Sequence, residues 1–224
     1  MLRFASRLIE RVLWQRPLVQ QWEDRARRYG VRAVLNIGHS EEEVSKVTEF
    51  QRRELYPLFR EALRGDERVV LDFGCGPGRF TCDLREMIRG RAIGVDPIQS
   101  FLDLAPRHPE VDYHLMTEGR IPVDSQSVDA IWICLVLGGI HGRTLKATVS
   151  EIHRVLRPGG LLFLVENTTE DGGGPFWAFR SVAKYRTLLS PIPLMHKHDY
   201  HDLGERISVM TGRKPLAPAR GGGT

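Results

Sequence analysis

Residues 69–80 read VVLDFGCGPGRF, and this stretch decides the fold of the chain. The apolar run predicts a buried strand with Asp72 near its end, and the glycines that follow predict a tight turn and then a helix near Gly78. Glycine takes backbone angles that other residues avoid, so a ligand can come close to the main chain here. A helix that starts at this point would direct its N-terminal amides at that ligand.

The spacing of the glycines indicates the kind of ligand. Gly74, Gly76 and Gly78 follow a GxGxG pattern, whereas the third glycine of the dinucleotide fingerprint would fall at Arg79. The carboxylate of Asp72 would repel a pyrophosphate but attract an ammonium group. The loop therefore suits a ligand with a cationic amino-acid end better than it suits a dinucleotide.

A second acid lies at the end of the next apolar run. Asp96 follows residues 92–95, and a carboxylate in this position can accept both hydroxyls of a ribose. An ammonium site at Asp72, a nucleoside site at Asp96 and glycines between them describe S-adenosyl-L-methionine, whose demethylated product is S-adenosyl-L-homocysteine.

Apolar runs and helical stretches alternate from residue 68 onward, which predicts βαβ units and a mainly parallel sheet. The runs are residues 69–73, 92–95, 130–135 and 161–165. The RPGG turn of residues 157–160 is expected to precede the last of these strands. Residues 196–201 and 206–213 flank a turn at 202–205, so we expect an antiparallel hairpin that closes the sheet.

Residues 68–165 resemble the class I S-adenosylmethionine-dependent methyltransferases, of the small-molecule type. The resemblance rests on four motifs in the family's order: VLDFGCGPGRF, GVDP, IPVDSQSVDAIW and EIHRVLRPGGLLFLVEN. It implies an α/β, Rossmann-like fold with a seven-stranded, mostly parallel sheet, helices on both faces and an antiparallel last strand. Residues 207–213 fit that last strand.

The resemblance also implies a set of cofactor-binding residues: Asp72, Gly74, Cys75, Gly76, Gly78, Asp96, Pro97, Ile98, Glu118, Gly119 and Leu135. Asp72 would orient the loop and the methionine ammonium, and Asp96 would hold the ribose. Pro97 and Ile98 would flank the adenine. Many relatives carry an Asp-Ala pair that receives the adenine amino group, and in this chain Glu118 is the candidate for that role.

A second departure from the family follows residues 130–135. Relatives often have a histidine here, whereas residues 135–141 read LVLGGIH, so that no role carries over directly to His141. The two glycines predict either open space near the sulfonium methyl, which would admit a bulky acceptor, or close packing. Phe176 and Trp177 are expected to start a helix, and they would form either an aromatic wall for the acceptor or a contact between helix and sheet.

Methyl transfer requires an acceptor lone pair in line with the sulfonium methyl, and positioning alone can supply roughly 7–11 kcal/mol. An amine acceptor must arrive unprotonated, whereas an alcohol usually needs a base, for which histidine is suited. We select His141 and His198 as candidate bases. His198 lies in the HKHDYHD run of residues 196–202, where strand geometry would place His196, His198 and Tyr200 on one face. A metal site in this run is the weaker alternative, and no metal is predicted.

The chain divides into an N-terminal helical extension (residues 1–65), a core that binds S-adenosylmethionine (66–216) and a flexible tail (217–224). In the extension we expect helices over residues 1–15 and 18–29, and a third over 40–63 that begins with a capping box of Ser40 and Glu43. The net charge is +4, and seven arginines against three acids place the whole excess in residues 1–30. This segment is a lid, a membrane-surface anchor or a helix with a solvated basic face.

Composition limits the class of protein. Three cysteines without a CxxC pair suit a reducing compartment, so we expect a cytoplasmic protein. The main body has no basic bias, which makes a nucleic-acid partner unlikely. The predicted function is methyl transfer to an oxygen or nitrogen of a small molecule such as a sugar, a polysaccharide precursor or a secondary metabolite. The alternatives are a methyltransferase acting on protein, RNA or a membrane lipid, and a non-catalytic protein that binds the cofactor; the oligomeric state is left open.

Overall fold

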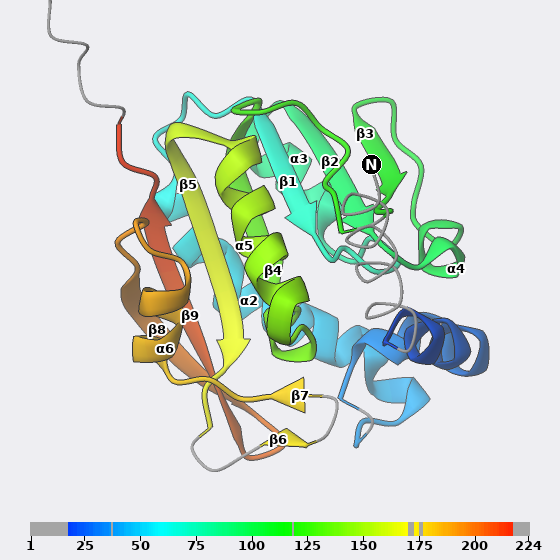
Figure 1. Cartoon of the computed structure of the whole chain (residues 1–224). Helices are drawn as coiled ribbons and strands as arrows, with labels where there is room; N and C mark the ends of the chain where they lie inside the picture. The colour runs from blue at the N-terminus through cyan, green and yellow to red at the C-terminus, as the bar shows by residue number, and fades with distance from the viewer. Residues whose placement is uncertain (1–17, 37, 118, 170–172, 175–176, 217–224) are drawn as a thin grey trace, which may run out of the picture.

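A seven-stranded sheet forms the centre of the chain (Figure 1). The computed structural model describes residues 18–36, 38–117, 119–169, 173–174 and 177–216. The strands lie in the order β3-β2-β1-β4-β5-β9-β8. Their bounds are β1 Val69–Phe73, β2 Arg91–Asp96, β3 Val111–Leu115, β4 Val128–Cys134, β5 Leu156–Asn167, β8 Met195–Asp202 and β9 Glu205–Arg213.

The strand directions confirm the predicted fold class. Strands β3, β2, β1, β4 and β5 run parallel to one another, whereas β9 is antiparallel to both of its neighbours, β5 and β8. The chain is therefore Rossmann-like with an antiparallel last strand. Strands β8 and β9 form the expected hairpin, and its turn lies at Leu203 and Gly204.

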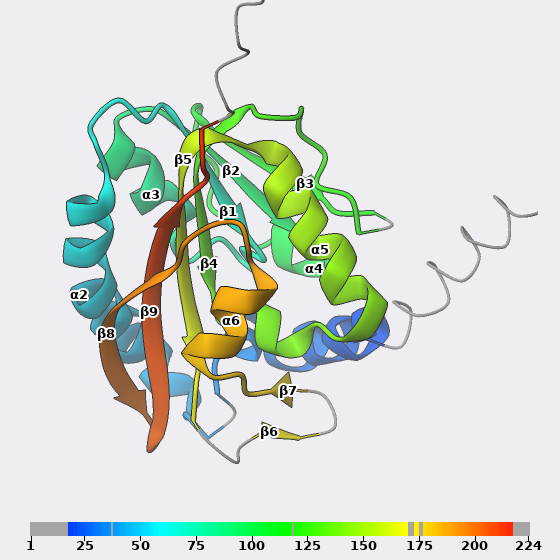
Figure 2. The ribbon, with the colours of Figure 1, turned by 60° about the vertical axis from the view of Figure 1, so that its left-hand side comes forward.

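Helices cover both faces of the sheet (Figure 2). Helices α2 and α3 pack on one face, and α5 and α6 pack on the other. Their bounds are α2 Val44–Ala62, α3 Thr81–Ile88, α5 Gly142–Val155 and α6 Val182–Leu188, and a short helix α4 spans Gln99–Leu102. Two short strands, β6 Gly173–Gly174 and β7 Trp177–Ala178, pair outside the main sheet.

Aromatic side chains attach α2 to the sheet. The rings of Trp132 and Phe163 stack with their centroids 4.7 Å apart, and Phe59 of α2 meets both rings edge-on at 5.3 Å. All three side chains are fully buried. Helix α2 therefore shares a core with strands β4 and β5, although the sequence placed it in an N-terminal extension.

The start of α2 follows the predicted capping box. The amide of Ser40 donates a hydrogen bond of 2.7 Å to the Glu43 carboxylate, and a 3-10 turn over Glu41–Glu43 leads into the helix. Residues 18–29 are helical as expected, and Gly30 after them has a φ of 52°. The helix expected over residues 1–15 and the tail 217–224 lie outside the described residues. Within the described part of the chain, no helix is both long and apolar enough to cross a membrane.

Four local predictions differ from the structure. The helix after the glycine loop starts at Thr81 rather than near Gly78. Residues 157–160 lie inside β5 as a bulge, since the pairing shifts from Val128–Leu156 to Ala130–Leu161. Trp177 belongs to β7 and not to a helix. Strand β3 was missed because several of its side chains are partly exposed at the sheet edge, which weakens the apolar pattern.

Candidate functional site

A cavity of about 1290 Å³ opens at the carboxyl ends of the parallel strands. The ends of β1, β2, β4 and β5 supply one wall, and residues from the 18–36 segment supply another. Ligands bind at this edge of open α/β sheets. The cavity exceeds the roughly 300–1,000 Å³ of a typical small-molecule pocket.

The glycine loop is held close to the end of β2. The amides of Gly74 and Cys75 both donate to the carbonyl of Val95, at 2.8 and 3.1 Å. Gly74 has a φ of 71°, and a Cβ there would lie 2.6 Å from Cγ2 of Val136. Glycine is therefore required at this position, both for the backbone angle and for the close approach.

The four predicted loop residues do not all face the cavity. Gly74 and Cys75 line it, whereas Gly76 and Gly78 do not. The Gly76 amide donates to the Asp96 carboxylate at 2.9 Å, and a Cβ on Gly78 would lie 2.6 Å from the Tyr113 hydroxyl. Gly76 and Gly78 therefore support the shape of the loop without lining the cavity.

Asp72 and Asp96 enter the same cavity from neighbouring strands. Asp72 is 3% exposed and accepts a hydrogen bond of 2.7 Å from the Thr81 hydroxyl, and Asp96 is 7% exposed and accepts amide hydrogen bonds from Gly76 and Ile98. Burial raises the pKa of each carboxyl to about 7, against the opposing effect of these hydrogen bonds. Both acids therefore exchange protons near neutral pH.

The other predicted cofactor residues also lie at this site. Pro97, Ile98, Gly119 and Leu135 line the cavity, and Glu118 lies outside the described residues. Leu135 has a φ of 57°, an unusual backbone angle for a leucine, and its amide donates to the carbonyl of Val165 at 2.8 Å. The chain thus turns sharply away from β4 at the cavity wall.

The structure separates the two candidate bases. His141 is exposed just before α5, and it lies between Ile140 and Thr144, two residues that line the cavity. His198 lies outside the cavity on β8, with Nε2 at 3.2 Å from the Glu54 carboxylate of α2. The contact with Glu54 joins β8 to α2 and gives no support to a role of His198 as a base.

The predicted alternation along β8 holds from His198 to Asp202 and is wrong for His196. The pairing of β8 with β9 shifts between His196 and His198, so the regular alternation is broken at that point. His196 contacts Asp199 at 2.7 Å instead of sharing a face with His198 and Tyr200. Among the described residues there is no group of three or more His, Cys, Asp or Glu that could hold a metal ion.

The predicted open space at Gly138 and Gly139 is filled by Trp177. A Cβ on Gly138 would lie 2.4 Å from Nε1 of the indole, and one on Gly139 would lie 3.0 Å from the ring. The glycines therefore serve close packing. Trp177 also lines the cavity together with Phe179, so an aromatic wall does stand beside this loop.

Glu166 organises the same loop, a role that the sequence did not reveal. Its side chain is fully buried at the end of β5, and its carboxylate accepts hydrogen bonds from the amides of Val136 (2.9 Å), Leu137 (2.6 Å) and Gly138 (3.2 Å). The Tyr185 hydroxyl donates a fourth, at 3.2 Å. Burial raises the pKa of Glu166 to about 7. The only signal in the sequence was an acid at the end of the apolar run LLFLVEN.

The 18–36 segment covers the side of the cavity next to α4. Trp22 meets Phe101 edge-on with the ring centroids 6.4 Å apart, and the Ser100 hydroxyl donates to the Glu23 carboxylate at 3.1 Å. Arg25 donates to the carbonyls of Ala33 and Leu35, which fixes the turn at the end of the segment. Side chains of this segment therefore form part of the cavity wall.

The hairpin of β8 and β9 closes the opposite side. Asp202 and Glu205 line the cavity there, and the Glu205 carboxylate accepts a hydrogen bond of 2.7 Å from the side-chain Nδ2 of Asn167. The Asp202 carboxylate lies 2.6 Å from Nε2 of His39, a buried residue that follows the 18–36 segment. The N-terminal part of the chain is thus connected to both sides of the cavity.

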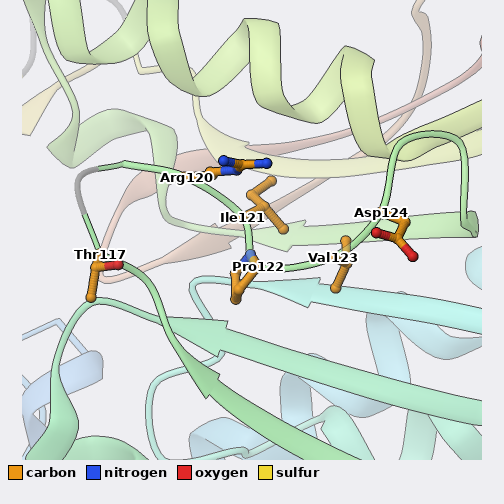
Figure 3. A pocket seen from close by; sticks show the side chains of 6 residues that line it. All are labelled: Thr117, Arg120, Ile121, Pro122, Val123 and Asp124. Carbon is orange, nitrogen blue, oxygen red and sulfur yellow. The ribbon is translucent and has the colours of Figure 1, made fainter.

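A second, smaller cavity of about 400 Å³ lies beside the chain that links β3 to β4 (Figure 3). It is lined by Thr117 and residues 120–124, and Thr117 also lines the large cavity. Among the residues that the structure describes, no predicted catalytic or cofactor-binding residue lines the small cavity. The candidate site is therefore the large one.

Comparisons with known proteins identify a methyltransferase domain in the chain. A family model described as a methyltransferase domain matches residues 70–160. An uncharacterized methyltransferase of Mycobacterium tuberculosis is 42% identical over 106 residues, which cover 46% of this chain and 42% of the relative. The malonyl-[acyl-carrier protein] O-methyltransferase of Yersinia pestis is 33% identical over 132 residues, which cover 57% of this chain and 47% of the relative. The chain therefore spans less than half the length of these curated relatives.

A solved structure supports the fold over most of the chain. Phosphoethanolamine N-methyltransferase 1 of Haemonchus contortus, in complex with phosphoethanolamine and S-adenosylhomocysteine, matches with a TM-score of 0.68. The match covers 93% of this chain and 50% of that protein at 17% identity. At this identity the likeness concerns the fold.

We predict that replacing Glu166 by leucine destabilises the fold. Three buried amides would lose their acceptor, at about 1–3 kcal/mol each, so the free energy of unfolding should fall by at least about 3 kcal/mol. Urea denaturation followed by circular dichroism measures this change. Glu166→Gln keeps one acceptor oxygen and should cost less. Glu61→Leu is the matched control, because the Glu61 side chain is 70% exposed on α2. Equal stabilities of the Glu166→Leu and Glu61→Leu variants would contradict the role of Glu166.

Proposed function

We propose that this chain, which carries a domain of the class I S-adenosylmethionine-dependent methyltransferase family, transfers a methyl group from S-adenosyl-L-methionine to an oxygen or nitrogen of a small-molecule acceptor. One observation carries the proposal. Asp72 and Asp96 enter a single cavity from neighbouring strand ends, with the glycine loop between them. This arrangement fits a ligand that combines an ammonium group with a ribose.

Each part of the cofactor has candidate partners in the cavity. Asp72 would attract the ammonium, and Gly74 would let the methionine part approach the backbone. Asp96 would accept the ribose hydroxyls with the lone pairs that its two amide hydrogen bonds leave free. Pro97 and Ile98 would flank the adenine, and both line the cavity.

The cofactor supplies an activated methyl group on a sulfonium, so the chain has to position the acceptor and exclude water. The acceptor's lone pair forms the new bond to the methyl carbon while the electron pair of the old bond stays on sulfur. A hydroxyl acceptor also loses a proton. His141 remains our candidate to receive it, because Ile140 and Thr144, which lie on either side of it in the sequence, both line the cavity. An amine that arrives unprotonated needs no such base.

A small-molecule acceptor is favoured by the cavity walls. Trp177 and Phe179 offer aromatic surface, and Asp202 and Glu205 offer polar partners on the side of the hairpin. The covering segment of residues 18–36 would act as a lid. Such walls suit a sugar, a polysaccharide precursor or a secondary metabolite better than a folded macromolecule. A cytoplasmic location is also part of the proposal, and it is supported by three cysteines that are all free thiols.

Binding of S-adenosyl-L-homocysteine, measured by calorimetry, tests the cofactor assignment. We expect micromolar affinity, and Asp96→Ala should weaken it by more than about tenfold, because the ribose loses a charged hydrogen-bond acceptor worth roughly 1.5–3 kcal/mol. Asp103→Ala is the matched control, because Asp103 is an exposed acid directly after α4. An affinity that Asp96→Ala leaves unchanged would rule out the ribose site at this residue.

Affinity should also depend on pH. In the free protein the pKa of Asp72 is raised to about 7, so the carboxyl is largely protonated below that value and must lose its proton to bind an ammonium. Affinity for S-adenosyl-L-homocysteine should therefore fall as the pH drops below 7, by up to about tenfold per pH unit for each such carboxyl. Calorimetry between pH 5.5 and about 7.5 measures this, and Asp72→Asn should flatten the profile. An affinity that rises toward acid pH would contradict the role of Asp72.

A further inference from the structure

Two aromatic side chains share one side of the segment at β7. Trp177 is the first residue of this strand, and Phe179 directly follows its last residue. Side chains two positions apart in an extended chain point to the same side. Both residues line the large cavity. They therefore form one surface, which we call the aromatic wall.

The loop after β4 fixes the position of this wall. The guanidinium of Arg180, the residue after Phe179, donates to the carbonyls of Leu137 at 2.7 Å and Ile140 at 2.8 Å. The indole of Trp177 lies against the same loop, and the three atoms nearest to a Cβ on Gly138 would all belong to Trp177. The aromatic wall is thus held by hydrogen bonds and by close packing.

The order of the strands places the aromatic wall beside the methionine end of the proposed cofactor site. The ribose and ammonium residues lie on β2 and β1, and β4 and β5 follow next in the sheet. The loop after β4 meets the glycine loop through Val136, which lies against Gly74, and it meets Trp177 through Gly138. The residues proposed for the adenine follow β2, on the other side of β1. The part of the cavity at the aromatic wall is therefore left for the acceptor.

Polar side chains of the hairpin line the cavity beyond β5. Asp202 and Glu205 are paired across β8 and β9. One oxygen of Asp202 contacts His39, and one oxygen of Glu205 accepts a hydrogen bond from Asn167. The second oxygen of each carboxylate accepts no hydrogen bond from a residue that the structure describes. Because an ionised carboxylate only accepts hydrogen bonds, a ligand at this side has to offer hydroxyl or amine hydrogens.

We propose that the acceptor is a ring compound that lies with one face on the aromatic wall and directs hydroxyl or amine groups toward Asp202 and Glu205. This inference rests on the proposed function and names the class of acceptor for that site. The apolar face of a sugar ring and an aromatic ring both suit a flat aromatic surface, because each buries carbon there without losing a hydrogen bond. Trp177 is then a residue that determines acceptor specificity.

The first test compares ring acceptors with open-chain compounds that carry similar donors. The pairs are D-glucosamine with D-glucamine, for a sugar ring, and catechol with ethylene glycol, for an aromatic ring. In at least one pair the ring compound should give a kcat/KM at least about tenfold higher than its open-chain match. Formation of S-adenosyl-L-homocysteine measures the turnover, and the pair that reacts tells a sugar from an aromatic acceptor.

The second test removes the aromatic wall. Trp177→Ala should raise the KM of the preferred ring acceptor by about tenfold to a hundredfold, and it should change the affinity for S-adenosyl-L-homocysteine by less than about twofold. Trp177→Phe should restore part of the loss. Phe50→Ala is the matched control, because it removes an aromatic ring from α2 that does not line the cavity. Thermal melting verifies that each variant is folded.

Gly138→Ala separates the position of the indole from general damage to the fold. The added methyl should displace the Trp177 ring and raise the KM of the acceptor. In the Trp177→Ala background the same methyl has room, so it should change this KM by less than about twofold.

Two results would overturn the proposal: turnover that favours the open-chain compounds or is absent from all four although the chain binds S-adenosyl-L-homocysteine, and a KM that Trp177→Ala leaves unchanged. If the unaltered chain does not bind S-adenosyl-L-homocysteine, the proposed function itself fails, and this outcome is distinct from a wrong class of acceptor.

Discussion

Buried carboxylates at the ends of three strands hold the loops around the cavity. Asp96 of β2 accepts hydrogen bonds from the backbone amides of Gly76 and Ile98. Glu166 of β5 accepts them from three backbone amides of the loop after β4. Asp72 of β1 accepts a hydrogen bond from the hydroxyl of Thr81, the first residue of α3. An isolated charge is costly to bury, so each of these carboxylates needs its hydrogen-bond donors. Each carboxylate thereby fixes the position of the residues that carry its donors. The shape of the site follows from these requirements.

The N-terminal part of the chain completes the site in two ways. The 18–36 segment lines the cavity and packs against Phe101 of α4. Helix α2 shares its core with Trp132 and also holds Arg79 beside the glycine loop. The 18–36 segment and helix α2 both precede residues 70–160, the stretch that matches the methyltransferase domain model.

Local patterns predicted much of the fold and little of the packing between its parts. The run ending in Asp72, the capping box of Ser40 and the closing hairpin are contiguous signals, so sequence alone was sufficient for them. The contact of Trp177 with Gly138 joins distant segments, and no periodicity reports it. The shift in β8 that separates His196 from His198 depends on the pairing with β9. Glu166 carried only the weak signal of an acid after an apolar run.

We expect the cavity to bind S-adenosylmethionine with its methionine ammonium at Asp72 and its ribose at Asp96, two carboxylates on neighbouring strands. A crystal structure of the full chain with S-adenosyl-L-homocysteine is the most direct test. We expect the ribose hydroxyls at Asp96 and the ammonium at Asp72. A ligand bound elsewhere, or bound with its ribose away from Asp96, would contradict it.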